Sequence, residues 1–190
     1  ISTGVGAGIV IDGHVLHGAH HMAGELGHLT IDPVGPRCGC GGRGHIEAYA
    51  GGDALTSRAK DAWPAGVRAD GSAAPINVKG LVEAAASGDA TDAIAVAIAV
   101  LWLSIDPARL VIGGAIGIRQ HWLVRHAVRK ARHCLGRLAS RPATPVPAAL
   151  GTSAPLVGAA LLALESARLR ANSAPSLSRP VRTWWTQHCE

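Results

Sequence analysis

The feature that most constrains this chain is a glycine-rich loop that also carries thiols and imidazoles. Residues 28–52 read HLTIDPVGPRCGCGGRGHIEAYAGG, with Cys38 and Cys40 one residue apart between His28 and His45. This segment has too few apolar side chains to be held in place by burial, and a flexible linker would need neither thiols nor imidazoles. A bound ion would supply the missing folding free energy. The loop therefore predicts a metal site.

Two thiolates and two neutral imidazoles form a donor set that suits Zn²⁺ in a closed tetrahedron. The expected zinc ligands are His28, Cys38, Cys40 and His45. The C-x-C spacing is tighter than the usual gap of two to four residues, so two reduced thiols beside unrelated histidines are the alternative. The four cysteines follow no regular disulfide framework, which favours a reducing, cytoplasmic location.

The composition favours a globular domain and sets limits on its partners. Of the 190 residues, 48% are hydrophobic and 16% charged, which argues against disorder. The longest apolar run, residues 93–105, is short of the roughly 20 residues that span a bilayer, so we expect no membrane segment. The net charge of +5 gathers partly in residues 125–141. No aromatic side chains interleave that run, which favours a solvated helix face over a nucleic-acid surface.

The order of elements predicts an α/β domain, because strands alternate with helices. A hairpin is expected over residues 6–19, since Asp12-Gly13 suits the positive φ angles of a type I′ turn. We expect a loop over 24–44, a polar excursion over 63–75 and a disordered tail over 171–190. Helices are expected over 46–60, 78–87, 90–104, 120–138 and 154–168, and strands over 109–117 and 144–150. The 90–104 helix is apolar on nearly all sides and should be buried, ending at Asp106-Pro107.

Two motifs resemble those of the ROK family of sugar kinases and sugar-responsive repressors. The family's pattern is G-E-x-G-H and then C-x-C-G-x-x-G-C-x-E; here GELGH (24–28) and CGCGGRGHIE (38–47) stand at the same spacing. STGVGAGIVIDG, DPARLVIGG and GTSAPLVGAALLA resemble the family's second phosphate motif, its adenosine-side strand and its last helix. The likeness covers about residues 1–164. It implies the actin-like ATPase (ribonuclease H-like) fold, with residues 1–170 as the C-terminal lobe.

The resemblance also implies roles for individual residues. Zinc would be held by His28, Cys38 and Cys40, and His45 stands where the family has a fourth, cysteine ligand. That exchange removes one negative charge and changes the reach of the ligand. Glu25, His28 and Glu47 match positions that hold sugar hydroxyls. With one His28 nitrogen on zinc, the other is left as an N–H donor toward the sugar.

The phosphate side of the resemblance rests on glycines. Thr3, Gly4 and Gly6 belong to a T-G-x-G-x-G turn, where glycine lets backbone amides approach an anion. Gly113 and Gly114 would let the backbone pass close to adenine or ribose, and residues 151–153 would line the same cleft. The complete protein would bind ATP with Mg²⁺ between two lobes, and the family commonly forms homodimers.

The resemblance implies a further lobe that carries a D-x-G-G-T motif and the catalytic aspartate. Neither is found here, because Asp12 lies in a hairpin turn and Asp32 precedes a proline in the loop. We therefore expect no catalytic residue and no kinase turnover in this chain alone, and interpret it as a fragment or a gene that has lost its front half. The sequence leaves three functions open. They are the C-terminal lobe of a glucokinase-like kinase acting on a hexose or N-acetylhexosamine, the sugar-sensing half of a repressor that binds DNA through a winged-helix domain upstream, and a degenerate remnant.

Overall fold

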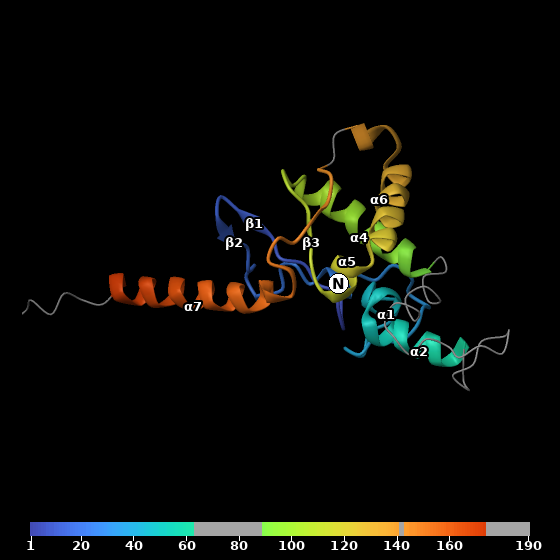
Figure 1. The fold of residues 1–190 in the computed structure, drawn as a ribbon, viewed down its shortest axis with the longest axis horizontal. Coiled ribbons are helices and arrows are strands. Elements are labelled where there is room, and N and C mark those ends of the chain that lie inside the picture. The colour runs from blue at the N-terminus through green and yellow to red at the C-terminus, as the bar shows by residue number, and fades with distance from the viewer. Residues whose placement is uncertain (63–88, 141–142, 174–190) are drawn as a thin grey trace, which may run out of the picture. The chain divides into compact units, whose positions relative to one another are not determined.

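A computed structural model describes residues 1–62, 89–140 and 143–173 of the chain (Figure 1). It divides into two compact units, residues 1–152 and 153–190, which are described separately. The first unit contains β1 (Val10–Ile11), β2 (His14–Val15), η1 (Leu26–His28), α1 (Glu47–Ala50), α2 (Gly52–Ala62), α4 (Asp89–Ile105), β3 (Val111–Ile112), α5 (Ala115–Arg119), α6 (His121–Leu135), η2 (Gly136–Ser140) and β4 (Val146–Pro147). The expected elements over 63–75 and 78–87 lie outside the described residues.

The predicted hairpin is confirmed. β1 and β2 pair antiparallel with Val10 opposite Val15, and the two turn residues, Asp12 and Gly13, have φ angles of 51° and 81°. Both central residues therefore have positive φ, as a type I′ turn requires. The side chains of this hairpin are exposed, so its position depends on backbone contacts more than on burial.

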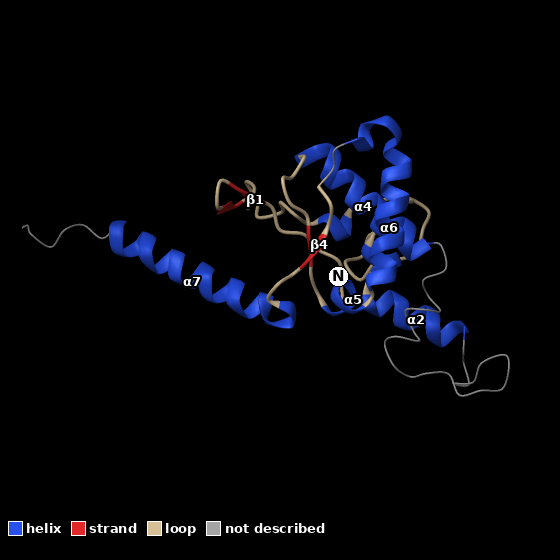
Figure 2. Cartoon of the chain, turned by 45° about the horizontal axis from the view of Figure 1, so that its top comes forward, coloured by secondary structure: helices blue, strands red, loops and turns tan. Residues whose placement is uncertain are grey.

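The core lies between α4 and α6 (Figure 2). α4 buries a row of mostly small residues. α6 packs against α4 with Leu123, Ala127 and Ala131, each of which is fully buried. Alanines at both surfaces let the two helix backbones approach closely. α4 ends at Ile105, as the following Asp106-Pro107 predicts. The prediction that the whole helix is buried is wrong, because Leu103 on it is 61% exposed.

α6 shows the opposite pattern, with one apolar and one basic face. Arg125, Arg129 and Arg132 are exposed, while the apolar residues of the helix face α4. The helix ends at Leu135, before Gly136 with φ 54°, and a 3₁₀ turn continues to Ser140. The expected helix over 120–138 is therefore two elements.

β3 and β4 form a parallel pair in which Val111 lies opposite Val146. The expected strand over 109–117 is shorter than predicted, because α5 begins at Ala115 directly after Gly114. Gly114 has φ 81°, and a Cβ there would lie 2.3 Å from the carbonyl oxygen of Ile1. The turn thus requires glycine at position 114 for two reasons: the positive φ angle, and the overlap that a side chain would make with Ile1.

The helix predicted over 46–60 is broken at Gly51, whose ψ of 151° is extended. The break separates α1 from α2 and frees the first amides of α2. Gly52 N donates to Ser2 O at 2.9 Å and Asp53 N to Thr3 O at 3.4 Å. The first amides of a helix have no acceptors within the helix, and here the carbonyl groups of the N-terminal segment accept from them.

The second unit begins at Ser153, the last residue of η3 (Gly151–Ser153), and contains α7 (Ala154–Ser173). α7 runs five residues beyond the expected end at 168, so residues 171–173 are helical rather than part of a tail. Leu156, Leu161 and Leu164 on it are exposed. Within 1–62, 89–140 and 143–173, no helix combines the length and apolar character that crossing a membrane requires.

The β3–α5 turn gives a stability test with a matched control. Gly114→Ala should lower the free energy of unfolding by about 2 kcal/mol or more, because alanine is strained at positive φ and its Cβ meets Ile1 O. Gly113→Ala should cost far less, since its Cβ would meet only Ala148 at 3.6 Å. Urea unfolding of both variants measures the difference. Equal destabilisation would contradict this account of the turn.

Candidate metal centre

The cysteine loop is shaped by a short series of backbone bonds. Bridges between Thr30 and His45 and between Arg37 and Arg43 bring its two limbs together. At the tip, Cys38 N donates to Gly42 O at 2.9 Å and Gly41 N donates to Cys38 O at 3.0 Å. The C-x-C spacing thus lies within one tight turn. That turn places both thiols on the same side of the loop as the histidines that follow and precede it.

Gly44 closes the base of the loop. Its φ is 61°, and a Cβ would overlap the carbonyl oxygen of Asp32, since the two limbs cross in direct backbone contact. Gly44 O accepts from Ile31 N at 2.8 Å. Asp32 is in turn held by the hydroxyl of Tyr49 on α1, which donates to its carboxylate at 3.1 Å. The loop is therefore fastened to the helix that follows it.

The four predicted metal ligands come together. One donor atom from each of His28, Cys38, Cys40 and His45 lies within 4.8 Å of all the others. His28 Nδ1 is 3.8 Å from Cys38 Sγ, and His45 Nδ1 is 3.2 Å from Cys40 Sγ. A tetrahedral zinc ion needs such atoms about 3.3 to 3.8 Å apart, so a contraction of at most about 1.5 Å would close the site. The donor set and its geometry fit zinc.

His45, where the resemblance implies a cysteine, is turned into the cluster. Its ring lies 5.4 Å from that of His28, and its atoms fill the space above Gly42. A Cβ on Gly42 would lie 2.3 Å from His45 Cε1. A glycine at 42 therefore makes room for the longer imidazole.

Cys38 and Cys40 differ in their surroundings. Cys38 is only 6% exposed, whereas Cys40 is exposed. Burial raises the pKa of the Cys38 thiol above its ordinary value, so this thiol keeps its proton at neutral pH unless a cation replaces it. A zinc ion would supply that compensation by binding the thiolate directly.

His28 has its two nitrogens directed differently. Nδ1 lies toward Cys38, and Nε2 lies 3.7 Å from a carboxylate oxygen of Glu25. The side chains of His28 and Glu25 are 36% and 55% exposed, so this pair is accessible to a ligand. The sequence predicts one nitrogen for the metal and the other as a donor toward a ligand, and in the structure the second nitrogen lies beside the carboxylate of Glu25.

Glu47 links the metal centre to the glycine turn at the start of the chain, a contact that sequence reasoning missed. Its Oε2 accepts from Val5 N at 2.9 Å, and Oε1 accepts from the thiol of Cys38 at 3.9 Å. A Cβ on Gly4 would lie 2.3 Å from Oε2. The absence of a side chain at Gly4 therefore lets this carboxylate come close to the turn. The glycine was the only sign of this contact in the sequence.

The remaining phosphate-side candidates are placed as follows. Thr3 is exposed and its carbonyl receives the Asp53 amide, while Gly6 has open space around it. Gly113 O accepts from Ile1 N at 2.8 Å, and Gly114 lies against the same residue. The structure thus brings the 113–114 turn beside the segment that leads into Thr3. Both features lie in the first unit.

Comparisons with known proteins agree on one family. The family model described as the ROK family matches residues 1–166. The chain is 36% identical over 137 residues to an N-acetylmannosamine kinase of Citrobacter koseri, covering 66% of this chain and 44% of that protein. It is 34% identical over 173 residues to a glucokinase of Pyrobaculum calidifontis, covering 87% and 56%. The chain thus spans about half the length of these curated relatives.

Solved structures give the same answer. A ROK hexokinase from Thermus thermophilus matches with a TM-score of 0.68 at 32% identity, covering 87% of this chain and 56% of that one. A ROK glucokinase from Streptomyces griseus in complex with glucose and AMPPNP matches with 0.63 at 35%, covering 85% and 58%. A ROK transcriptional regulator homologous to the E. coli Mlc protein matches with 0.59 at 33%, covering 77% and 40%.

The cluster predicts one zinc ion per chain with a steep pH dependence. Because both thiols must lose a proton on binding, and the pKa of Cys38 is raised, the affinity should rise with pH, by up to about a hundredfold for one unit near neutrality. Competition with a chromophoric chelator at several pH values measures this. Cys38→Ser should lose the ion, and the absence of zinc from native protein would remove the site.

The room above Gly42 gives a finer test of His45 as a ligand. Gly42→Ala should displace the imidazole and weaken zinc binding by about ten- to a hundredfold, the usual cost of disturbing a ligand's support. Gly39→Ala, in the same turn but with open space around its Cβ, is the matched control and should bind zinc normally. Normal affinity in both would mean that His45 is not a ligand.

Proposed function

The chain belongs to the ROK family, and we propose that it forms the C-terminal lobe of an ATP-dependent sugar kinase of the glucokinase type. The substrate would be a hexose or an N-acetylhexosamine, phosphorylated by the complete protein. The observation that carries this proposal is the placement of His28, whose Nδ1 lies toward the thiol of Cys38 and whose Nε2 lies toward the carboxylate of Glu25. The actin-like ATPase (ribonuclease H-like) fold that the sequence predicts is that of the matched kinases.

The proposed sugar contacts follow from the geometry of three side chains. Zinc, when bound, fixes the ring of His28 and neutralises two thiolates. His28 Nε2 then carries a proton and donates to a sugar hydroxyl, while Glu25 accepts from a neighbouring one. Glu47 would offer Oε1 to the ligand, because its Oε2 is engaged by Val5 N and because the thiol of Cys38, which donates to Oε1, would lose its proton on binding zinc. Two acceptors beside one donor suit the adjacent hydroxyls of a sugar.

We place the nucleotide at the glycine turns. Thr3 and the open backbone at Gly6 would approach the phosphates of ATP with its Mg²⁺, and Gly113 and Gly114 would lie on the adenosine side. Support comes from the matched glucokinase, whose complex contains glucose and AMPPNP. Neither Asp12 nor Asp32 suits a general base, since Asp12 is in the exposed hairpin turn and Asp32 binds Tyr49 and the Val34 amide. The base would come from the other lobe.

A second candidate is the sugar-sensing half of a ROK repressor, which the matched transcriptional regulator supports. In that case the same cluster would hold a sugar as a signal, and contact with DNA would belong to another domain. Binding of AMPPNP with Mg²⁺ separates the two, because a sensor needs the sugar contacts without a nucleotide.

Titration calorimetry of the zinc-loaded chain with glucose and N-acetylmannosamine tests the sugar site. Glu25→Gln should weaken binding by about tenfold or more at unchanged zinc content, because a neutral amide replaces a charged acceptor. Asp61→Asn, an exposed acid on α2, is the control and should leave binding unchanged. Heats that do not distinguish the two variants would exclude Glu25 from the site.

A further inference from the structure

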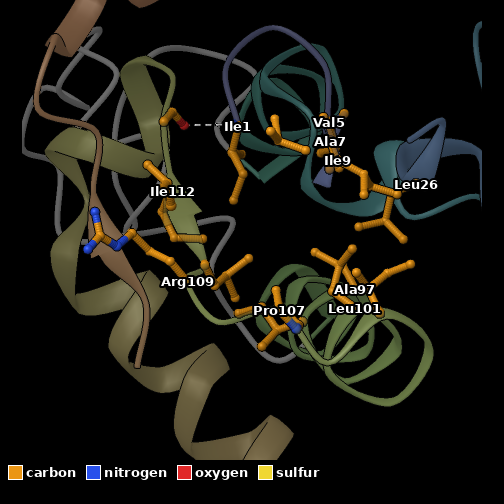
Figure 3. A pocket seen from close by; sticks show the side chains of 18 of the residues that line it. Ile1, Val5, Ala7, Ile9, Leu26, Ala97, Leu101, Pro107, Arg109 and Ile112 are labelled. Atoms are coloured by element: carbon orange, nitrogen blue, oxygen red, sulfur yellow. Dashed lines mark hydrogen bonds between the residues drawn. The ribbon is translucent and has the colours of Figure 1, made fainter. Parts of the chain in front are cut away.

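Four histidines stand in the β1–β2 hairpin and the loop after it, and the proposed sugar and nucleotide sites use none of them. All four are exposed, and they are His14, His17, His20 and His21. β1 and the residues before it border an apolar pocket, which segment 5–11 lines with side chains such as Ile9 (Figure 3). None of the four histidines lines that pocket. Packing therefore does not account for so many imidazoles in one short segment.

The loop from His17 to Ala23 is closed by its own backbone. Ala23 N donates to His17 O at 3.1 Å, and His21 N donates to Gly18 O at 3.5 Å. Gly18 and His21 have positive φ angles of 75° and 57°. Histidine is one of the few residues besides glycine that are enriched in this conformation. The two reversals return the chain toward its start, which brings His21 back beside His17.

The imidazole rings of His17 and His21 lie next to each other. Their centroids are 5.6 Å apart, and the ring planes meet at 61°. The two histidines of the cysteine cluster, His28 and His45, have almost the same arrangement, with 5.4 Å and 65°. Two imidazoles that bind one ion through nitrogen at about 2.0 to 2.1 Å in a tetrahedron have centroids about 5 Å apart. The loop thus presents a second pair of imidazoles at a separation that one ion spans.

The donor atoms decide which ions suit this pair. Both ligands are neutral nitrogens, and thiolates, which favour zinc at the cysteine cluster, are not among them. Imidazole suits copper, nickel and zinc, whereas Mg²⁺ and Ca²⁺ prefer oxygen ligands. Within the described ranges, no further His, Cys, Asp or Glu forms a compact group of three with the pair. The other positions on the ion would therefore be held by water or by an exchangeable ligand.

We propose that His17 and His21 form a second metal site, separate from the cysteine cluster, which binds a divalent ion of the nickel, copper and zinc group through two imidazole nitrogens. The ion closes the loop with a second link beside the hydrogen bond from Ala23 N to His17 O. That loop leads directly to Glu25, whose amide donates to Met22 O at 3.3 Å. Occupancy thus restrains the segment ahead of Glu25. The inference does not rest on the proposed function.

Nickel titration of the zinc-loaded chain tests the site, because Ni²⁺ suits imidazole and its paramagnetism broadens the NMR signals of the groups that bind it. We expect the ring signals of His17 and His21 to broaden first, at unchanged zinc content. The open loop would not bind the ion, so exchange of the Ala23 amide should slow by about tenfold at a free nickel concentration ten times the Kd.

Three variants locate the ion. His17→Ala removes one ligand, and His21→Asn removes the other but keeps a residue that tolerates the left-handed backbone. Each should weaken nickel binding at least about tenfold. His20→Ala is the matched control, because His20 is an exposed histidine of the same loop that lies outside the ring pair. It should bind nickel as the unchanged chain does.

Unchanged nickel affinity in both ligand variants would overturn the proposal. An equal loss of affinity in His20→Ala would also overturn it, since the histidines would then bind as an unspecific group rather than as a pair. Nickel that enters only by displacing zinc would place the ion at the cysteine cluster and exclude this site. Zinc content should be equal in all these proteins, so a failure of the cysteine cluster is recognised separately.

Discussion

The carboxylate of Glu47 joins the glycine turn at the start of the chain to the cysteine loop. One oxygen holds the amide of Val5 and the other lies beside Cys38, so a single side chain spans the glycine turn and the metal loop. Val5 and Cys38 are both buried, and the absence of a side chain at Gly4 leaves room for the carboxylate. The position of Glu47 is itself fixed because it begins α1, whose following break at Gly51 ties α2 to the same N-terminal segment.

The charge of a zinc ion bound at this cluster would depend on the fourth ligand. Two thiolates on Zn²⁺ give a neutral site, whereas a third thiolate in place of His45 would leave one negative charge. A neutral centre would repel the nearby carboxylates of Glu25 and Glu47 less than an anionic one. The imidazole is also longer than a thiol, and the bare backbone at Gly42 accommodates the difference. Histidine in place of cysteine at position 45 is thus compatible with the rest of the loop, and its consequence would be one negative charge fewer at the metal.

Local signals predicted the elements whose conformation is decided locally. Asp12-Gly13 indicated the hairpin, Asp106-Pro107 the end of α4, and the residue types of the loop indicated the metal cluster. The break at Gly51 and the left-handed turn at Gly114 were not predictable, because both depend on Ser2, Thr3 and Ile1, which are distant in the sequence. The same holds for Glu47, whose motif suggested a ligand contact but not a bond to Val5. Burial of α4 was overestimated because composition alone does not tell which flank is covered.

The segment Ile1–Val5 is where these dependences meet. Ile1 is bonded to the β3–α5 turn, Ser2 and Thr3 cap α2, and Val5 is held by Glu47, so five consecutive residues contact the β3–α5 turn, α2 and α1. Four of the five use backbone atoms for these contacts, which makes the connections independent of side-chain identity and compatible with the small residues of the turn. The positions of the Glu47 carboxylate and of the glycine turn are therefore set together, because Glu47 is bonded to Val5 in the same stretch of backbone.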